Sequence, residues 1–134
     1  MKVCLDTNVL VSALTTRGLS ADVMRLVLTE HELVLPAVVL AELDRILATK
    51  FRLAAADHAA ALEFFADVPT VPKPRRSLAA PSIRDPADAW VLASAVAGQA
   101  AVLISGDKDL LDVAAQAPIE ICTPRAFYEA QRTR

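Results

Sequence analysis

Apolar residues along the chain gather in short continuous runs that alternate with longer stretches of helical periodicity. The runs are rich in Val, Leu and Ile and do not alternate with polar residues, a pattern typical of strands that are covered on both faces. We therefore predict four strands, at Val3–Asp6, Leu33–Pro36, Val102–Ser105 and Ile119–Thr123.

Helical stretches separate these runs, and several begin at a capping residue or at a proline. The predicted helices run from a Ser20 cap to about Glu30, from Pro36 to about Lys50, and over Ala55–Asp67, Pro86–Ala97 and Pro124–Arg132. This alternation predicts a three-layer α/β/α fold with a mainly parallel central sheet of four to five strands. Without a repeat or an internal linker, the 134 residues are expected to form a single domain, residues 1–134.

Residues 68–84 break the alternation. Four prolines exclude a helix and allow at most a short edge strand near Val68–Val71. The same segment is the most basic loop of the chain, through Lys73, Arg75 and Arg76. It is either a solvated connector or a loop that contacts phosphate groups or a partner.

Composition excludes some classes of protein and leaves others open. No apolar stretch reaches the roughly 18 residues of a membrane span, and Asp6 interrupts the apolar N-terminus, so we expect a cytoplasmic protein without a membrane segment. Cys4 and Cys122 are interpreted as small buried hydrophobic residues and not as a disulfide. The formal net charge of −2 neither indicates nor excludes nucleic-acid binding.

Two acidic residues follow predicted strands. Asp6 ends the first strand, and Asp107 comes two residues after the third. The carboxyl ends of parallel strands share one edge of the sheet, where α/β proteins bind ligands. We therefore expect Asp6 and Asp107 to lie near each other, although either can also cap the following helix.

A third acid lies within a predicted helix. Asp88 shares a helix face with the apolar residues Leu92 and Ala95, so it is expected on the side facing the core. An ionised carboxylate there needs a partner, hydrogen bonds or a metal. The competing interpretation makes Asp85 the N-cap, Pro86 the first helical residue and Asp88 part of the cap.

A fourth acid comes from the helix after Pro36, but periodicity does not identify it. Val39, Leu43 and Ile46 define the apolar stripe, and Glu42 and Asp44 border its two sides about equally. A cluster of carboxylates without Cys or His ligands favours Mg²⁺, Mn²⁺ or Ca²⁺ over zinc, and phosphoryl chemistry is a common use of such a site.

Four segments resemble the PIN-domain family, in the family's order and spacing and over nearly the whole chain. They are Leu-Asp-Thr-Asn-Val-Leu-Val-Ser-Ala-Leu at residues 5–14, Ala-Glu-Leu at 41–43, Arg-Asp-Pro-Ala-Asp-Ala at 84–89 and Ser-Gly-Asp-Lys-Asp-Leu-Leu at 105–111. Within the family, the chain is most similar to the VapC-type toxins.

The resemblance implies a metal-dependent endoribonuclease that uses Mg²⁺ or Mn²⁺, and it favours Glu42 over Asp44. The implied catalytic and metal-binding residues are Asp6, Glu42, Asp88 and Asp107. Asn8 and Ser105 match supporting positions, while Asp85 and Asp109 are either accessory ligands or helix caps. The resemblance also implies an RNA substrate, an antitoxin protein as partner and a homodimer.

Aromatic residues are scarce, so RNA is expected to be held through its phosphates and not mainly by base stacking. The expected contacts are Arg17, Lys73, Arg75 and Arg76, whereas Trp90 is expected to be packed.

Other functions remain as alternatives. The first is a solitary PIN-fold protein that processes or binds RNA with weak or no catalysis. A haloacid-dehalogenase-like phosphatase needs Asp-x-Asp after the first strand, but the chain has Asp6-Thr7-Asn8. A receiver domain needs an acidic pair there, which is also missing.

Overall fold

The structure, a computed structural model, describes residues 1–76 and 83–133. Its centre is a five-stranded sheet in the order β3-β2-β1-β4-β5, in which every neighbouring pair is parallel. The strands are β1 (Lys2–Leu5), β2 (Glu32–Pro36), β3 (Thr70–Val71), β4 (Val102–Ile104) and β5 (Glu120–Cys122).

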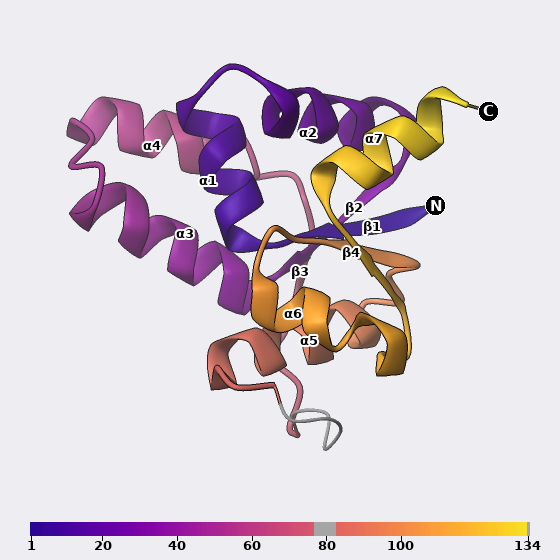
Figure 1. Cartoon of the computed structure of the whole chain (residues 1–134). Helices are drawn as coiled ribbons and strands as arrows, with labels where there is room; N and C mark the ends of the chain where they lie inside the picture. Colours follow the sequence, from indigo (N-terminus) through magenta and orange to yellow (C-terminus); the bar gives the residue numbers. More distant parts are fainter. Residues whose placement is uncertain (77–82, 134) are drawn as a thin grey trace.

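Helices cover both faces of this sheet. They are α1 (Thr7–Thr15), α2 (Leu19–Glu30), α3 (Ala37–Thr49), α4 (Ala55–Glu63), α5 (Pro86–Ala97), α6 (Lys108–Asp112) and α7 (Pro124–Arg132), with one 3₁₀ turn at Ala114–Gln116. Figure 1 shows α1, α2 and α7 on one side of the sheet and α5 and α6 on the other. The predicted three-layer fold with a parallel sheet is confirmed. None of the helices in the described ranges is long and apolar enough to cross a membrane.

The strands are apolar because both of their faces pack against helices. All three residues of β4 and the last three of β1 are fully buried, as the unbroken apolar runs predicted. Cys4 and Cys122 are free thiols on β1 and β5, which β4 separates. The predicted edge strand is β3, which lies at one end of the sheet.

Three helices, α1, α2 and α4, differ from the predictions, and some strand ends shift by one residue. The periodicity did not predict α1, because its Val and Thr residues favour strands as much as helices. Ser20 is not a helix cap: α2 begins at Leu19 after Gly18, whose φ of 144° suits glycine. The helix predicted over Ala55–Asp67 ends at Glu63. Part of the predicted basic loop, residues 77–82, lies outside the described residues.

Because the strands are parallel, their carboxyl ends lie along one edge of the sheet, which we call the carboxyl rim. Helix α1 starts directly after β1, and α6 starts close after β4. The segment that links β3 to α5 also leaves from this edge. The rim is therefore where residues distant in sequence come together.

A close contact between α5 and the sheet gives a stability prediction. A Cβ added at Gly98 would lie 2.6 Å from Val34 Cγ1 and 2.8 Å from Val71 Cγ2, so Gly98→Ala is expected to destabilise the fold by about 1–3 kcal/mol. Gly106→Ala is the matched control, because nothing lies within 4 Å of its added Cβ. Urea unfolding measures both; equal midpoints for Gly98→Ala and the wild type would contradict the packing.

Candidate metal centre

Three carboxylates meet at the carboxyl rim. One oxygen each from Asp6, Asp88 and Asp107 lies within 4.8 Å of the others. Asp6 and Asp88 are only 4% and 8% exposed, and Asp107 is half-buried. The sequence predicted that these acids would converge, and the structure brings them together from β1, α5 and the turn after β4.

Asp6 is held by two hydrogen bonds. It is the N-cap of α1, and its Oδ1 accepts from the backbone N–H of Thr7 at 2.8 Å. Its Oδ2 accepts from Ser105 Oγ at 2.7 Å. Burial raises the pKa of Asp6 and the charges of Asp107 and Glu42 raise it further, while these two hydrogen bonds act in the opposite direction.

Ser105 connects two members of the cluster. While its hydroxyl donates to Asp6, the same oxygen accepts the backbone N–H of Asp107 at 2.9 Å. Asp107 in turn caps α6 by accepting the N–H of Asp109 at 2.8 Å. Since Ser105 is fully buried, this chain of hydrogen bonds fixes the relative positions of Asp6 and Asp107.

Asp88 is the least satisfied acid of the cluster. Asp85 caps α5 by accepting the N–H of Ala87 at 2.9 Å, as the capping interpretation predicted. Asp88 nevertheless lies on the buried side of the same first turn, and its Oδ2 has no hydrogen-bond partner within the described part of the chain. The pKa of Asp88 is raised to about 7, mainly by burial and then by the negative charges of Asp107, Asp6, Asp85 and Asp109, in that order.

This donor set fits a hard divalent cation. Each of the three converging side chains offers a carboxylate oxygen, and no Cys or His belongs to the group. Oxygen-only sites suit Mg²⁺ or Mn²⁺, whereas zinc sites normally include nitrogen or sulfur ligands. A cation here would give Asp88 Oδ2 a partner and would offset the repulsion among the acids.

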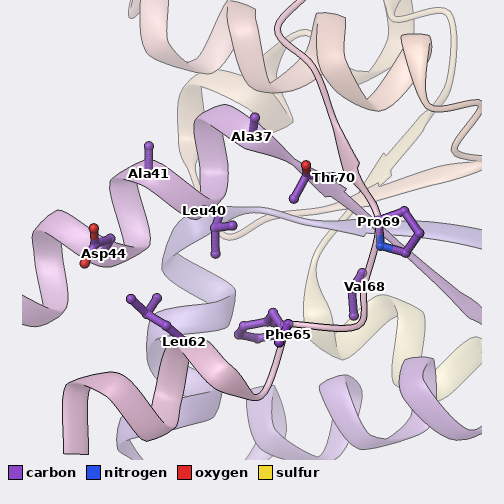
Figure 2. Close-up of a pocket in the computed structure, with 10 residues that line it drawn as sticks. Ala37, Leu40, Ala41, Asp44, Leu62, Phe65, Val68, Pro69 and Thr70 are labelled. Carbon is purple, nitrogen blue, oxygen red and sulfur yellow. The ribbon is translucent and has the colours of Figure 1, made fainter. Parts of the chain in front are cut away.

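The structure distinguishes the surroundings of Glu42 from those of Asp44. The periodicity of the sequence did not decide which of the two acids faces the site. Glu42 is half-buried and close enough to Asp6 to raise its pKa. Asp44 instead lies in hydrogen-bond contact with His58, with 2.6 Å between Asp44 Oδ1 and His58 Nε2. Asp44 also lines a pocket of about 670 Å³ between α3 and α4. Figure 2 shows Asp44 at this pocket, with Leu40 and Leu62 near it. Glu42 is therefore the α3 acid whose charge acts on Asp6, although it lies outside the group of three converging acids.

The sequence profile of the PIN domain family matches residues 2–109. The chain belongs to the PIN domain family. Among solved structures, a chain of "VapBC2 from Rickettsia felis bound to a DNA fragment from their promoter" has a TM-score of 0.62 and 16% identity, covering 91% of this chain and 97% of that one. At this identity the likeness shows the fold alone. A search of curated proteins finds no match.

Other predicted residues of this PIN domain lie around the acids or away from them. Asn8 is exposed in the first turn of α1, two residues from Asp6. Asp109 is half-buried beside the cluster and raises the pKa of Asp88. Arg17 lies beyond the opposite end of α1, a helix about 14 Å long, so the structure does not bring it to the centre.

The basic loop, one unpredicted contact and one unpredicted residue complete the surroundings. Lys73, Arg75 and Arg76 are exposed after β3. Sequence reasoning did not foresee that Lys73 Nζ lies 4.1 Å from the centroid of the Trp90 ring. It also missed Thr7, which is 3% exposed and whose Oγ1 has no hydrogen-bond partner among the described residues; a threonine beside a capping acid gives no distinctive signal.

Proposed function

We propose that this PIN domain is a metal-dependent endoribonuclease that hydrolyses RNA phosphodiester bonds, and that it is the toxin of a type II toxin–antitoxin pair. The observation that carries the nuclease is the convergence of Asp6, Asp88 and Asp107 within 4.8 Å, with Oδ2 of Asp88 lacking a hydrogen-bond partner among the residues that the structure describes. The toxin assignment is supported by the family and by the fold shared with the VapBC2 structure.

Asp6, Asp88 and Asp107 would hold Mg²⁺ or Mn²⁺, with Glu42 close by. When bound, such a cation supplies positive charge at the scissile phosphate and makes water more acidic. The choice of these two ions rests on the oxygen-only donor set.

The residues of the chain have distinct roles in this proposal. Ser105 keeps Asp6 and Asp107 in register through its two hydrogen bonds. Glu42 orients the attacking water and takes a proton from it at its carboxylate. Asp85 and Asp109 support the centre through their places at the starts of α5 and α6, and Asn8 is placed to contact the substrate near Asp6.

Phosphate contacts to the RNA are assigned to exposed cations. Arg75 and Arg76 are exposed on the segment that follows β3 at the carboxyl rim, and Lys73 lies on the same segment. Arg17, beyond the far end of α1, would contact only RNA that extends past the cleavage site. Contacts of this kind give affinity that falls with salt and carries little sequence specificity.

The proposed protein partners are an antitoxin and a second copy of the chain. A cluster rich in carboxylates is a natural target for an arginine of the antitoxin, because a guanidinium pairs with a carboxylate through two hydrogen bonds. Such an arginine would occupy the charge position of the metal and so inhibit the nuclease.

Cleavage of a mixed panel of structured and unstructured RNAs by the purified chain, in Mg²⁺, Mn²⁺ or EDTA, tests the proposed function. We expect cleavage with either metal and none in EDTA. Cleavage that persists in EDTA would contradict the metal dependence. No cleavage of any RNA by folded, antitoxin-free protein, together with no stabilisation by either metal, would favour a PIN domain used for binding.

Exchange of single acids on α3 tests the assignment of Glu42. Glu42→Gln is expected to lower cleavage by about a hundredfold, because an amide cannot take the proton of the attacking water. Asp44→Asn is the matched control on the same helix and is expected to keep activity within about twofold. Initial rates at saturating metal distinguish the two, and a larger loss in Asp44→Asn would reverse the assignment.

A further inference from the structure

The contact between Lys73 and Trp90 joins the basic segment to the helix that carries Asp88. Lys73 Nζ lies 4.1 Å from the ring centroid of Trp90, well inside the range of cation–π attraction. Trp90 follows Asp88 by two residues in α5, which places it about 3 Å further along the helix axis and on the opposite side of the helix. The lysine is therefore held against α5, on the side of that helix away from Asp88.

Charge explains why a fixed cation matters at this place. Six carboxylates surround the centre: Asp6, Glu42, Asp85, Asp88, Asp107 and Asp109. Even two divalent cations carry only four positive charges against these six negative charges. The centre thus keeps a net negative charge, which repels an approaching RNA phosphate at long range.

The opposite charge is concentrated on one side of the centre. From Val71 to Arg84 the sequence has no acidic residue and four cations, Lys73, Arg75, Arg76 and Arg84. The described part of this segment leaves β3 at the carboxyl rim, and Arg84 directly precedes Asp85, the cap of α5. RNA approaching from the side of β3 and α5 therefore meets positive charge first.

We infer that Trp90 is a positioning residue that holds Lys73 in place as a phosphate-binding cation, and that this pair contributes affinity for RNA that runs along α5 from the cleavage site. The inference rests on the proposed function. An ammonium group carries three N–H donors, and those that point away from the ring are available to phosphate oxygens. Because the ring already restricts the long lysine side chain, less conformational entropy is lost when RNA binds.

A double-mutant cycle tests this inference by steady-state kinetics on one cleaved RNA. Lys73→Met and Trp90→Leu are each expected to raise KM about two- to fivefold with kcat unchanged, and the double variant should be no worse than Lys73→Met alone. Lys73→Met should also reduce the slope of log affinity against log salt by about one unit. Lys73→Arg and Trp90→Phe should recover most of the affinity.

A second cation–aromatic pair provides the control. Arg132 lies 5.8 Å from the ring centroid of Tyr128 near the end of α7, which Figure 1 shows on the other side of the sheet from α5. Arg132→Met removes one positive charge in the same kind of contact and should leave KM unchanged. Lys73 is exposed, so its replacement tests the inference even if Trp90→Leu fails to fold.

Trp90 is the only tryptophan of the chain, so its fluorescence reports on the pair directly. Titrating RNA into catalytically impaired Asp6→Asn is expected to change the emission, and the change should shrink in Asp6→Asn/Lys73→Met. Wild-type KM in both single variants, or independent effects that multiply in the double variant, would overturn the inference while the nuclease stands. Absence of any cleavage by the wild type would instead overturn the proposed function, and this inference with it.

Discussion

Replacing Asp6 with Asn is expected to lower metal-dependent RNA cleavage by about 10²–10³-fold, the loss typical of removing one electrostatic group from an active site. Asp6 is buried, and each of its two carboxylate oxygens accepts a hydrogen bond. One accepts from the backbone N–H of Thr7 and the other from the hydroxyl of Ser105. An amide oxygen still caps α1, and Asn is among the best N-cap residues. The fold is therefore expected to survive while the charge that holds the metal is lost.

The measurement compares cleavage rates and thermal unfolding of the wild type, Asp6→Asn and Asp107→Asn. Asp107 caps α6 in the same way, so the argument applies to both acids. Addition of Mn²⁺ should raise the melting temperature of the wild type by mass action and have little effect on either variant. Full activity of both variants under limiting metal would refute the site.

Replacing Asp88 with Asn is expected to have opposite effects on activity and on stability. Cleavage should fall about a hundredfold or more, because a carboxylate of the three-acid group is lost. In the absence of metal, the variant should be more stable than the wild type at neutral pH by on the order of 1–2 kcal/mol. The reason is that Asp88 is buried among four other acids, and its Oδ2 has no hydrogen-bond partner in residues 1–76 and 83–133.

The pH dependence of this stability difference follows from the raised pKa of Asp88. In the unfolded chain the carboxyl ionises near its ordinary pKa of 3.8, whereas in the folded protein its pKa is about 7. Between these values the folded state binds the extra proton, so this group's contribution to stability is lost as the pH rises from about 4 to about 7.

Urea unfolding in EDTA at several pH values from 4 to 8 measures the effect. The curves of the wild type and Asp88→Asn should diverge with rising pH, because Asn has no proton to lose. Saturating Mg²⁺ should reduce the difference by stabilising only the wild type. A variant that is less stable than the wild type at pH 8 without metal would contradict this account.

Much of the fold could be predicted because its signals are local. The strands are buried on both faces, so their apolar runs are unbroken, and prolines and glycines mark several helix ends. Helix α1 escaped prediction because Val9 and Val11 suit a strand as well as a helix, and only its packing against α2 and α3 decides the outcome. Gly18, and not Ser20, is the N-cap of α2, because the chain has a positive φ there.

The candidate site could be predicted where topology alone places a residue. Asp6 and Asp107 follow neighbouring parallel strands, so their proximity requires no knowledge of side-chain packing. The choice between Glu42 and Asp44 depends on how α3 is rotated against α1 and α4, which periodicity left open. The stacking of Lys73 on Trp90 joins residues on two elements and leaves no periodic trace in the sequence.

The hydrogen bond between Ser105 and Asp6 spans 99 residues and exists only once β4 has docked beside β1. During translation the N-terminal part of the chain emerges first. The acids can therefore converge on Asp6 only after both α5 and β4 have been synthesised. The centre is therefore assembled only after residues 102–107 have been synthesised. If the proposed function holds, a nascent chain that ends before these residues cannot cleave RNA.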